Sequence, residues 1–161
     1  MPSHRLAPAR LLTIAALVLA LAGAMLVGSA AGPATPRASA LVSASVADHA
    51  ADLARSRKGS PYSYGATGPH RFDCSGLTRW VYRHLGKRLP HSAAAQAHRV
   101  KHIKRSRAVR GDLVFFYGGG GVYHVAIYDG RGQGIWHAPY PGARVRRDKI
   151  WTSRVFFGRV R

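Results

Sequence analysis

The chain contains a single cysteine, and its position constrains the fold more than any other feature of the sequence. Cys74 directly follows Asp73, a favoured helix N-cap residue, and apolar residues then recur at helical spacing. This pattern predicts a helix that begins near Cys74 and stops near Gly86. In the first turn of such a helix, the dipole and the unpaired backbone N–H groups favour a thiolate. Cys74 is therefore a candidate nucleophile, and the alternative is a small buried apolar side chain.

The first 40 residues predict an export signal with a small-residue processing region. Two arginines precede an apolar run from Leu11 to Val27, and small residues follow. We expect residues 1–40 to be removed and residues 41–161 to form one secreted domain. An uncleaved membrane anchor is the alternative, because the apolar run is close to the shortest length that crosses a bilayer.

The charge of the chain predicts anionic partners. There are 25 Lys and Arg residues against 6 acidic residues, which gives a formal net charge of +19. Such a surface attracts polyanions, and outside a bacterial cell the nearest of these are the anionic polymers of the cell wall and anionic lipid headgroups. Export and the lack of a recognised motif argue against nucleic acid. The basic segment from His98 to Arg110 has no interleaved aromatic residues, so it predicts a solvated face.

Helical patterns come first along the chain and strand-like patterns follow. Residues 33–45 predict a flexible linker, residues 46–58 predict a helix, and Ser92 can cap a short helix. Runs of β-branched and aromatic residues then predict strands at 112–117, 122–128, 134–138, 144–147 and 155–160. This order predicts an α+β domain with a mainly antiparallel sheet.

Two histidines are candidate partners of the cysteine, because a cysteine hydrolase needs a base and a group that orients the base. His124 and His137 lie in two predicted strands that the turn at 129–130 would join as a hairpin. Side chains alternate along strands, so both histidines can share one face if the register permits. Ordinary half-buried strand histidines fit the same pattern. His98 and His102 have a metal-like spacing without a third ligand, and we expect no metal and no cofactor.

A series of short blocks resembles the NlpC/P60 family of cysteine peptidases, which cut bacterial cell-wall peptides. The blocks occur in the family's order: Pro61-Tyr62, Phe72 to Leu77, Leu89-Pro90, Gln96, Gly111 to Phe116, His124 to Tyr128 and His137 to Pro139. The spacings fit as well, since Cys74 precedes His124 by 50 residues and His124 precedes His137 by 13. The resemblance implies a papain-like α+β domain in which the cysteine helix packs on an antiparallel sheet.

The resemblance also implies roles for the matching residues. Cys74 would be the nucleophile, His124 the general base and later acid, and His137 the residue that orients His124. Tyr62 would assist the oxyanion site beside the cysteine. The protein would then be a thiol protease of the wall, monomeric and secreted, acting on peptidoglycan stem peptides between D-glutamate and a diamino acid.

Asp73 and Ser75 match family residues that hold the free amine of the stem peptide. Gly65-Ala66 replaces the family's usual paired glycines and Arg110 replaces a common proline, which leaves the shape and specificity of the cleft open. One alternative is an amidase or acyltransferase on the same scaffold, because fold does not settle function. Another is a non-catalytic cationic protein that binds the wall or acts against bacteria.

Overall fold

A computed structural model describes residues 36–161, with side chains from residue 45 onward. Most of the predicted export signal lies outside these residues, so its cleavage stays a prediction. No helix in the described part of the chain has both the length and the apolarity to cross a membrane.

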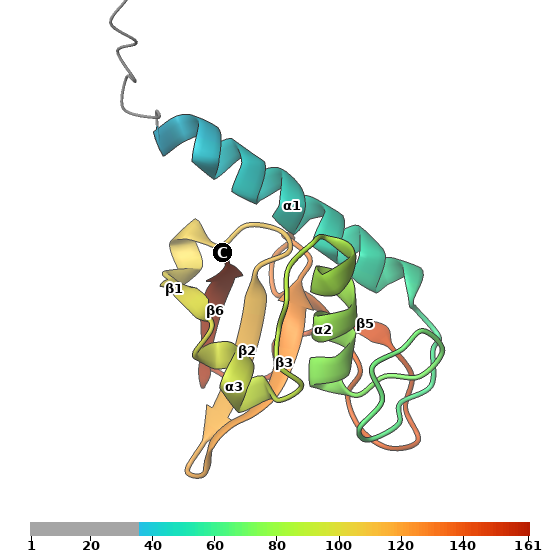
Figure 1. Cartoon of the computed structure of the whole chain (residues 1–161). Coiled ribbons are helices and arrows are strands. Elements are labelled where there is room, and N and C mark those ends of the chain that lie inside the picture. Colours follow the sequence, from blue (N-terminus) through green and yellow to red (C-terminus); the bar gives the residue numbers. More distant parts are fainter. Residues whose placement is uncertain (1–35) are drawn as a thin grey trace, which may run out of the picture. The chain divides into compact units, whose positions relative to one another are not determined.

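Three α-helices of the described chain pack against one face of a six-stranded sheet (Figure 1). They are α1 (Pro36–Ser56), α2 (Cys74–His84) and α3 (Ala93–Ala97). The start of α2 is where the sequence predicts it, because an Asp73 side-chain oxygen accepts a hydrogen bond from Gly76 N at 2.6 Å. Ser92 caps α3 in the same way, accepting from Ala95 N at 3.3 Å. Both helix starts are thus fixed by capping side chains.

The linker predicted at residues 33–45 is wrong from Pro36 onward, where α1 begins. The segment is rich in alanine, which has the highest helix propensity, and proline is favoured in the first turn of a helix. These local preferences outweigh the general association of Pro, Ala and Ser with linkers. The helix ends at Ser56, close to the predicted end.

Every neighbouring pair of strands in the sheet is antiparallel, in the order β1-β6-β2-β3-β4-β5. The strands are β1 (Val100–Ile103), β2 (Leu113–Gly118), β3 (Gly121–Tyr128), β4 (Gly134–His137), β5 (Arg146–Lys149) and β6 (Val155–Val160). The predicted α+β class and antiparallel sheet are confirmed. β5 starts two residues later than predicted, which brings Asp148 into the strand.

The edge strand β1 lies in the segment that the sequence predicts only as a basic face. It pairs with β6, while Lys101 and His102 stay exposed. Short edge strands with charged side chains resist pairing with other chains, and they lack a clear apolar alternation. The apolar alternation that predicts a strand is therefore missing from this segment.

The sheet buries apolar side chains on both faces. The larger cluster lies between the sheet and the helices and includes Leu77, Val81, Phe115, Val125 and Ile127. A smaller cluster on the opposite face contains Val114, Phe116, Ala126, Ile135 and Phe157. Because side chains alternate along β3, His124 lies on the face of Ala126.

The turn before β2 holds α1 against the domain. Gly111 has φ +91°, and a Cβ at this position would lie 1.7 Å from the Ala47 carbonyl oxygen of α1, so only glycine fits. Arg110 donates to Asp52 of α1 at 2.5 Å and to the Asp48 carbonyl oxygen at 2.6 Å. Arg110 thus ties the helix to the turn.

Candidate active site

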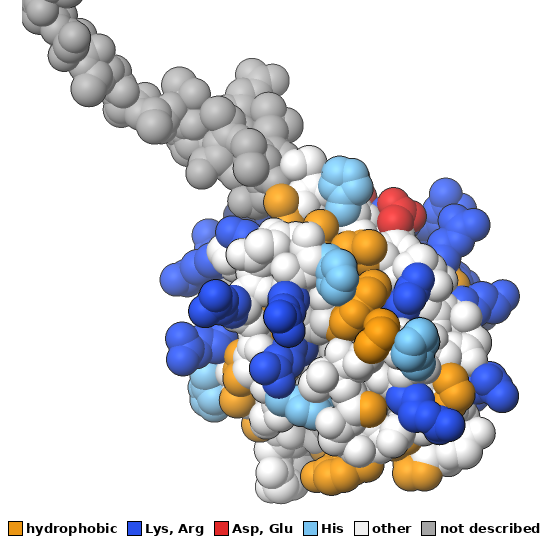
Figure 2. Space-filling view, turned by 45° about the vertical axis from the view of Figure 1, so that its right-hand side comes forward, with side chains coloured by type: hydrophobic (Ala, Val, Ile, Leu, Met, Phe, Trp, Pro, Cys, Tyr) orange, Lys and Arg blue, Asp and Glu red, His pale blue; other side chains and the backbone are white. Residues whose placement is uncertain are grey.

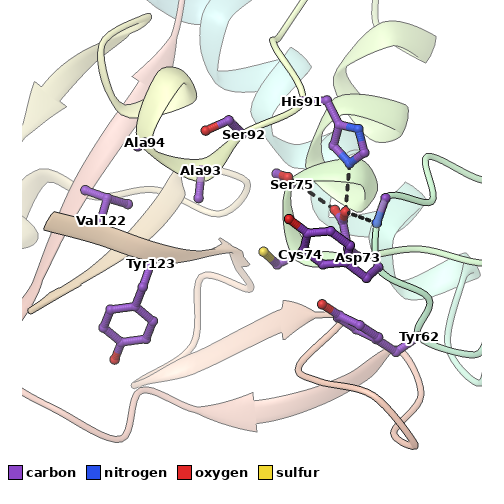
Figure 3. Close-up of a pocket in the computed structure, with 12 residues that line it drawn as sticks. Tyr62, Asp73, Cys74, Ser75, His91, Ser92, Ala93, Ala94, Val122 and Tyr123 are labelled. Carbon is purple, nitrogen blue, oxygen red and sulfur yellow. Dashed lines mark hydrogen bonds and ion pairs between the residues drawn. The ribbon is translucent and has the colours of Figure 1, made fainter. Parts of the chain in front are cut away.

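Cys74 is a free cysteine at the first residue of α2, and it lines a cavity of about 380 Å³. Figure 3 shows its sulfur between the Tyr62 ring and the strand that carries Val122 and Tyr123. Tyr62, Asp73 and Ser75 line the same cavity. The structure therefore places the cysteine and its three predicted neighbours around one cavity.

The thiol of Cys74 is neutral in the resting site. Burial raises its pKa above the usual value, and hydrogen bonding to the backbone of Val125 and Ser75 only partly opposes this. The expectation that the helix start alone favours a thiolate is therefore wrong for the unliganded protein. The contact with the Val125 backbone also places the sulfur beside the residue that follows His124 in β3.

His124 and His137 form a buried pair on one face of the sheet. His124 Nε2 lies 2.9 Å from His137 Nδ1. Burial, together with the nearby His137, lowers the pKa of His124 to about 3. Burial also lowers the pKa of His137, although its bond to Asp148 acts in the opposite direction. Both imidazoles are thus neutral at pH 7.

Asp148 extends this pair into a series of three side chains. One of its carboxylate oxygens lies 3.0 Å from His137 Nε2 and accepts from Arg146 Nε at 2.7 Å. Burial acts to raise the pKa of Asp148, but the hydrogen bonds with His137 and Arg146 outweigh it and hold the pKa below the usual value. Sequence reasoning missed Asp148. Its only signal was a single acidic residue in the otherwise basic strand that pairs with β4.

The charge state of Asp148 determines the tautomer of both histidines. An ionised carboxylate only accepts, so His137 Nε2 carries the hydrogen and His137 Nδ1 is an acceptor. His124 must then donate through Nε2. The basic lone pair of His124 is left on Nδ1, the nitrogen that faces away from His137. The series thus presents one ring nitrogen of His124 as a base.

Trp151 covers the histidine pair from one side. Its ring stacks on Phe116 at a centroid distance of 4.0 Å, and its centroid lies 5.6 Å from that of His124 and 5.5 Å from that of His137. This packing shields the imidazoles from water and contributes to their low pKa. Trp151 lies in the segment that connects β5 to β6, and no sequence motif predicted a role for it.

Asp73 is the centre of a hydrogen-bond network at the other end of the cavity. It accepts from Gly76 N, from Ser75 Oγ at 3.2 Å and from Gly65 N at 2.9 Å, and His91 Nε2 lies 2.8 Å from it. The dashed lines in Figure 3 show the bonds of Asp73 with Ser75, Gly65 and His91. The sequence indicated Asp73 as a helix cap, but it gave no role to His91.

Gln96, one of the residues in the matching blocks, is a structural support. Its side-chain amide is fully buried and donates to the Ser75 carbonyl oxygen at 2.9 Å and to the Pro90 carbonyl oxygen at 2.8 Å. It also accepts from Thr78 at 2.7 Å. These bonds join α3 to the first turn of α2 and so fix the shape of the cavity.

Tyr62 lies close enough to the thiol to interact with it. Burial raises the pKa of Tyr62, and the nearby Cys74 and Asp73 add to the effect. Its hydroxyl is therefore a protonated donor at neutral pH. Within residues 36–161, no three His, Cys, Asp or Glu side chains gather closely enough to hold a metal ion.

Comparison with known proteins places these features in a family. The model of the NlpC/P60 family matches residues 59–159. A "Probable endopeptidase" of Corynebacterium glutamicum is 46% identical over 100 residues, which cover 62% of this chain and 47% of that protein. The "Probable endopeptidase p60" of Listeria monocytogenes is 44% identical over 112 residues, 66% of this chain and 22% of that protein. The chain thus matches about half of the first relative and about a fifth of the second.

Solved structures of this family have a similar fold. The NlpC/p60 domain of the peptidoglycan hydrolase SagA superposes with a TM-score of 0.64 at 34% identity, covering 71% of this chain and 98% of that one. A hypothetical invasion protein of Mycobacterium tuberculosis gives a TM-score of 0.65 at 29% identity, with coverages of 74% and 64%. The fold and the cysteine at the helix start define a hydrolase domain of the cysteine-peptidase type. The chain belongs to the NlpC/P60 family, which confirms the resemblance seen in the sequence.

Proposed function

We propose that the protein is a peptidoglycan endopeptidase in which Cys74 is the nucleophile, His124 the base and His137 the residue that orients it. The observation that carries this proposal is the hydrogen-bonded series from His124 through His137 to Asp148, which begins on β3, the strand whose Val125 backbone contacts the Cys74 thiol. A base whose orientation is fixed by a third group is the arrangement that cysteine hydrolysis requires.

The first chemical step couples proton transfer to attack. Because thiol and imidazole are both neutral at rest, His124 Nδ1 takes the thiol proton as the sulfur attacks the amide carbonyl. The charge that develops on the carbonyl oxygen is held by backbone N–H groups of the first turn of α2, with the Tyr62 hydroxyl assisting. His124 then protonates the leaving amine, and water hydrolyses the thioester.

The proposed bond lies between D-glutamate and a diamino acid of the stem peptide, with the free amine of the peptide held at Asp73. All four lone-pair positions of the Asp73 carboxylate have partners. Ser75 donates its hydroxyl hydrogen to Asp73, so the lone pairs of its Oγ are free to accept from an ammonium group. In this proposal Asp73 supplies the negative charge that attracts the ammonium group, and Ser75 Oγ is the oxygen that accepts its hydrogen bond.

The test is digestion of a defined stem tripeptide, L-Ala-γ-D-Glu-diamino acid, by the wild type and by Cys74→Ala. The wild type should release L-Ala-D-Glu, identified by mass spectrometry, and Cys74→Ala should release nothing while keeping its circular dichroism spectrum. Release by the Cys74→Ala protein would refute the nucleophile. Cleavage only of muropeptides at the sugar-linked alanine would instead favour the amidase alternative.

We further propose that the protein acts as a secreted monomer and that its basic surface retains it on anionic wall polymers. Figure 2 shows Lys and Arg side chains spread over the described face, with acidic side chains visible only near the upper right. This surface also suits a non-catalytic wall-binding protein. The fixed orientation of the buried histidine pair favours the enzyme, because mere adhesion needs no oriented base.

A further inference from the structure

A second cavity, of about 440 Å³, lies on the histidine side of the site. Its walls are aromatic and charged, and they comprise Tyr123, His124, His137, Pro139, Tyr140, Arg146, Asp148 and Trp151. Tyr123 of β3 also lines the cavity that contains Cys74. The two cavities therefore adjoin across Tyr123, one beside the nucleophile and one beside the base.

The direction of the proposed reaction decides which part of the substrate enters each cavity. The base must return its proton to the leaving amine, so the leaving fragment lies on the side of His124. The acyl fragment extends the other way, toward Asp73 and Ser75. The second cavity is thus positioned to take the leaving fragment, an assignment that rests on the proposed function.

Arg146 is the feature of this cavity that can discriminate between leaving fragments. It lies directly across from His137 in the register of β4 and β5, so its side chain is on the same face. Hydrogen bonds to Asp148 and Tyr140 raise its pKa, and its Cζ lies 5.5 Å from the centroid of the Tyr140 ring. The guanidinium is therefore held in place and permanently charged.

The Arg146 guanidinium retains N–H groups that can donate hydrogen bonds to a ligand. Asp148 receives the Nε–H, and an arginine side chain has five N–H groups. The Arg146 side chain is 41% exposed, so a ligand can reach the remaining donors. A planar guanidinium with free N–H groups binds a carboxylate through two parallel hydrogen bonds.

We propose that this cavity is a subsite for the leaving fragment, in which Arg146 binds a carboxylate on the side chain of the leaving diamino acid. Tyr140 and Trp151, which are 55% and 51% exposed, form its apolar walls. The enzyme then prefers a leaving residue that carries a free side-chain carboxylate over one in which that carboxylate is an amide.

The experiment compares two stem tripeptides that differ only in this group, free acid or amide. For the wild type, kcat/KM should be about tenfold higher for the acid, the range of one charge-assisted contact. In Arg146→Gln the ratio should fall to about one. Any effect of the substitution on the histidines through Asp148 applies to both substrates and cancels in the ratio.

Arg147→Gln is the matched control, because Arg147 is the next residue of β5, points to the other face and pairs with Asp129. It should keep the wild-type ratio. A ratio of one in the wild type, or a tenfold ratio retained in Arg146→Gln, would overturn the subsite.

Binding to the Cys74→Ala protein separates this inference from the proposed function. Calorimetry should show tighter binding of the acid tripeptide than of the amide, and Arg146→Gln in the same background should remove the difference. If the wild type cleaves neither tripeptide but this preference is found, the function fails and the subsite stands. Equal binding of both tripeptides, or binding of neither, refutes the subsite whatever the activity.

Discussion

Burial sets the protonation state of each reactive side chain in this site. Cys74, His124 and His137 all lose hydration, so the neutral form of each is favoured. In the proposed mechanism, proton transfer from the thiol to the imidazole therefore takes place only with substrate bound, when the reacting carbonyl and its oxyanion donors are in place. Asp148 keeps the neutral histidines in the tautomer that leaves the lone pair of His124 on Nδ1, the nitrogen of the proposed base.

Asp148→Ala tests this tautomer argument. Without its acceptor, His137 can rotate or exchange tautomers, and His124 then loses its fixed orientation. We expect kcat to fall by about ten- to a hundredfold with KM unchanged, because Asp148 acts through His137. Lys149→Ala, a substitution of the next, exposed residue, is the control. Unchanged kcat in Asp148→Ala would show that the series is structural only.

The low pKa of His124 also predicts how stability depends on pH. The unfolded chain binds a proton near pH 6.5 while the folded chain does so only near pH 3. Stability is therefore fully present above pH 6.5 and is lost as the pH falls toward 3. Between pH 7 and pH 5 the loss from His124 alone is about 2 kcal/mol, measurable by urea unfolding.

His124→Gln should flatten this dependence, because glutamine does not titrate. The exposed His98, replaced in His98→Gln, is the control that should leave the dependence as it is in the wild type. Equal slopes in the wild type and His124→Gln would refute a buried neutral imidazole.

Sequence reasoning correctly predicted Cys74 at the start of a helix and both histidines on two strands that pair, because local patterns and spacing carry these positions. Sequence reasoning did not predict that the Cys74 thiol is neutral, because the burial that raises its pKa depends on contact with β3, a strand that is distant in the sequence. It also missed Asp148 and Trp151, since β5 and the segment after it have no apolar alternation. Which charged residue faces the site is decided by strand register, and register was fixed only by the pairing of β4 with β5.

At the scale of elements, the start of α2 combines a helix cap with the proposed site for the substrate amine. The Asp73 carboxylate caps the helix and at the same time holds the Gly65 loop and the His91 turn. The sequence predicted the cap and the helix correctly, because both are local signals. It could not predict the bonds to Gly65 and His91, because they depend on how separate loops meet.

Asp73→Ala should therefore lower both stability and substrate affinity. We expect a loss of about 2 kcal/mol in the free energy of unfolding, from the cap and the buried donors left unpaired. KM for a stem peptide with a free amine should rise. Ser56→Ala is the control, since this exposed hydroxyl donates to the Leu53 carbonyl oxygen at the end of α1 and does not line the cavity, so the substitution should leave KM unchanged. A variant that loses only stability would reduce Asp73 to a helix cap.

At the scale of the whole molecule, every acidic side chain already has a basic partner within the fold. All six aspartates pair with a basic side chain, among them Asp112 with Arg159 and Asp129 with Arg147. Most of the Lys and Arg residues between 45 and 161 are therefore left without an acidic partner. The positive field of the surface is uncompensated, and it extends over a Debye length of about 8 Å at physiological salt.

One basic cluster lies beside α2, where Arg79, Arg83 and Arg88 line a surface cavity of about 260 Å³ with Leu89 and no acidic residue. Three unpaired guanidinium groups in one hollow repel each other, and a phosphate or carboxylate polymer relieves that repulsion. The proposed retention on the wall should therefore depend more on this cluster than on other basic residues.

The final prediction compares two triple variants of equal net charge. One replaces Arg79, Arg83 and Arg88 with glutamine, and the other replaces Lys101, Lys104 and Arg105, which lie in and directly after the edge strand β1, in the same way. In pelleting assays with purified wall, the wild type should be released as NaCl rises, because salt screens exposed charges. The first variant should need less salt for release than the second. Equal release of both would assign retention to total charge, and salt-independent pelleting of the wild type would refute an electrostatic partner.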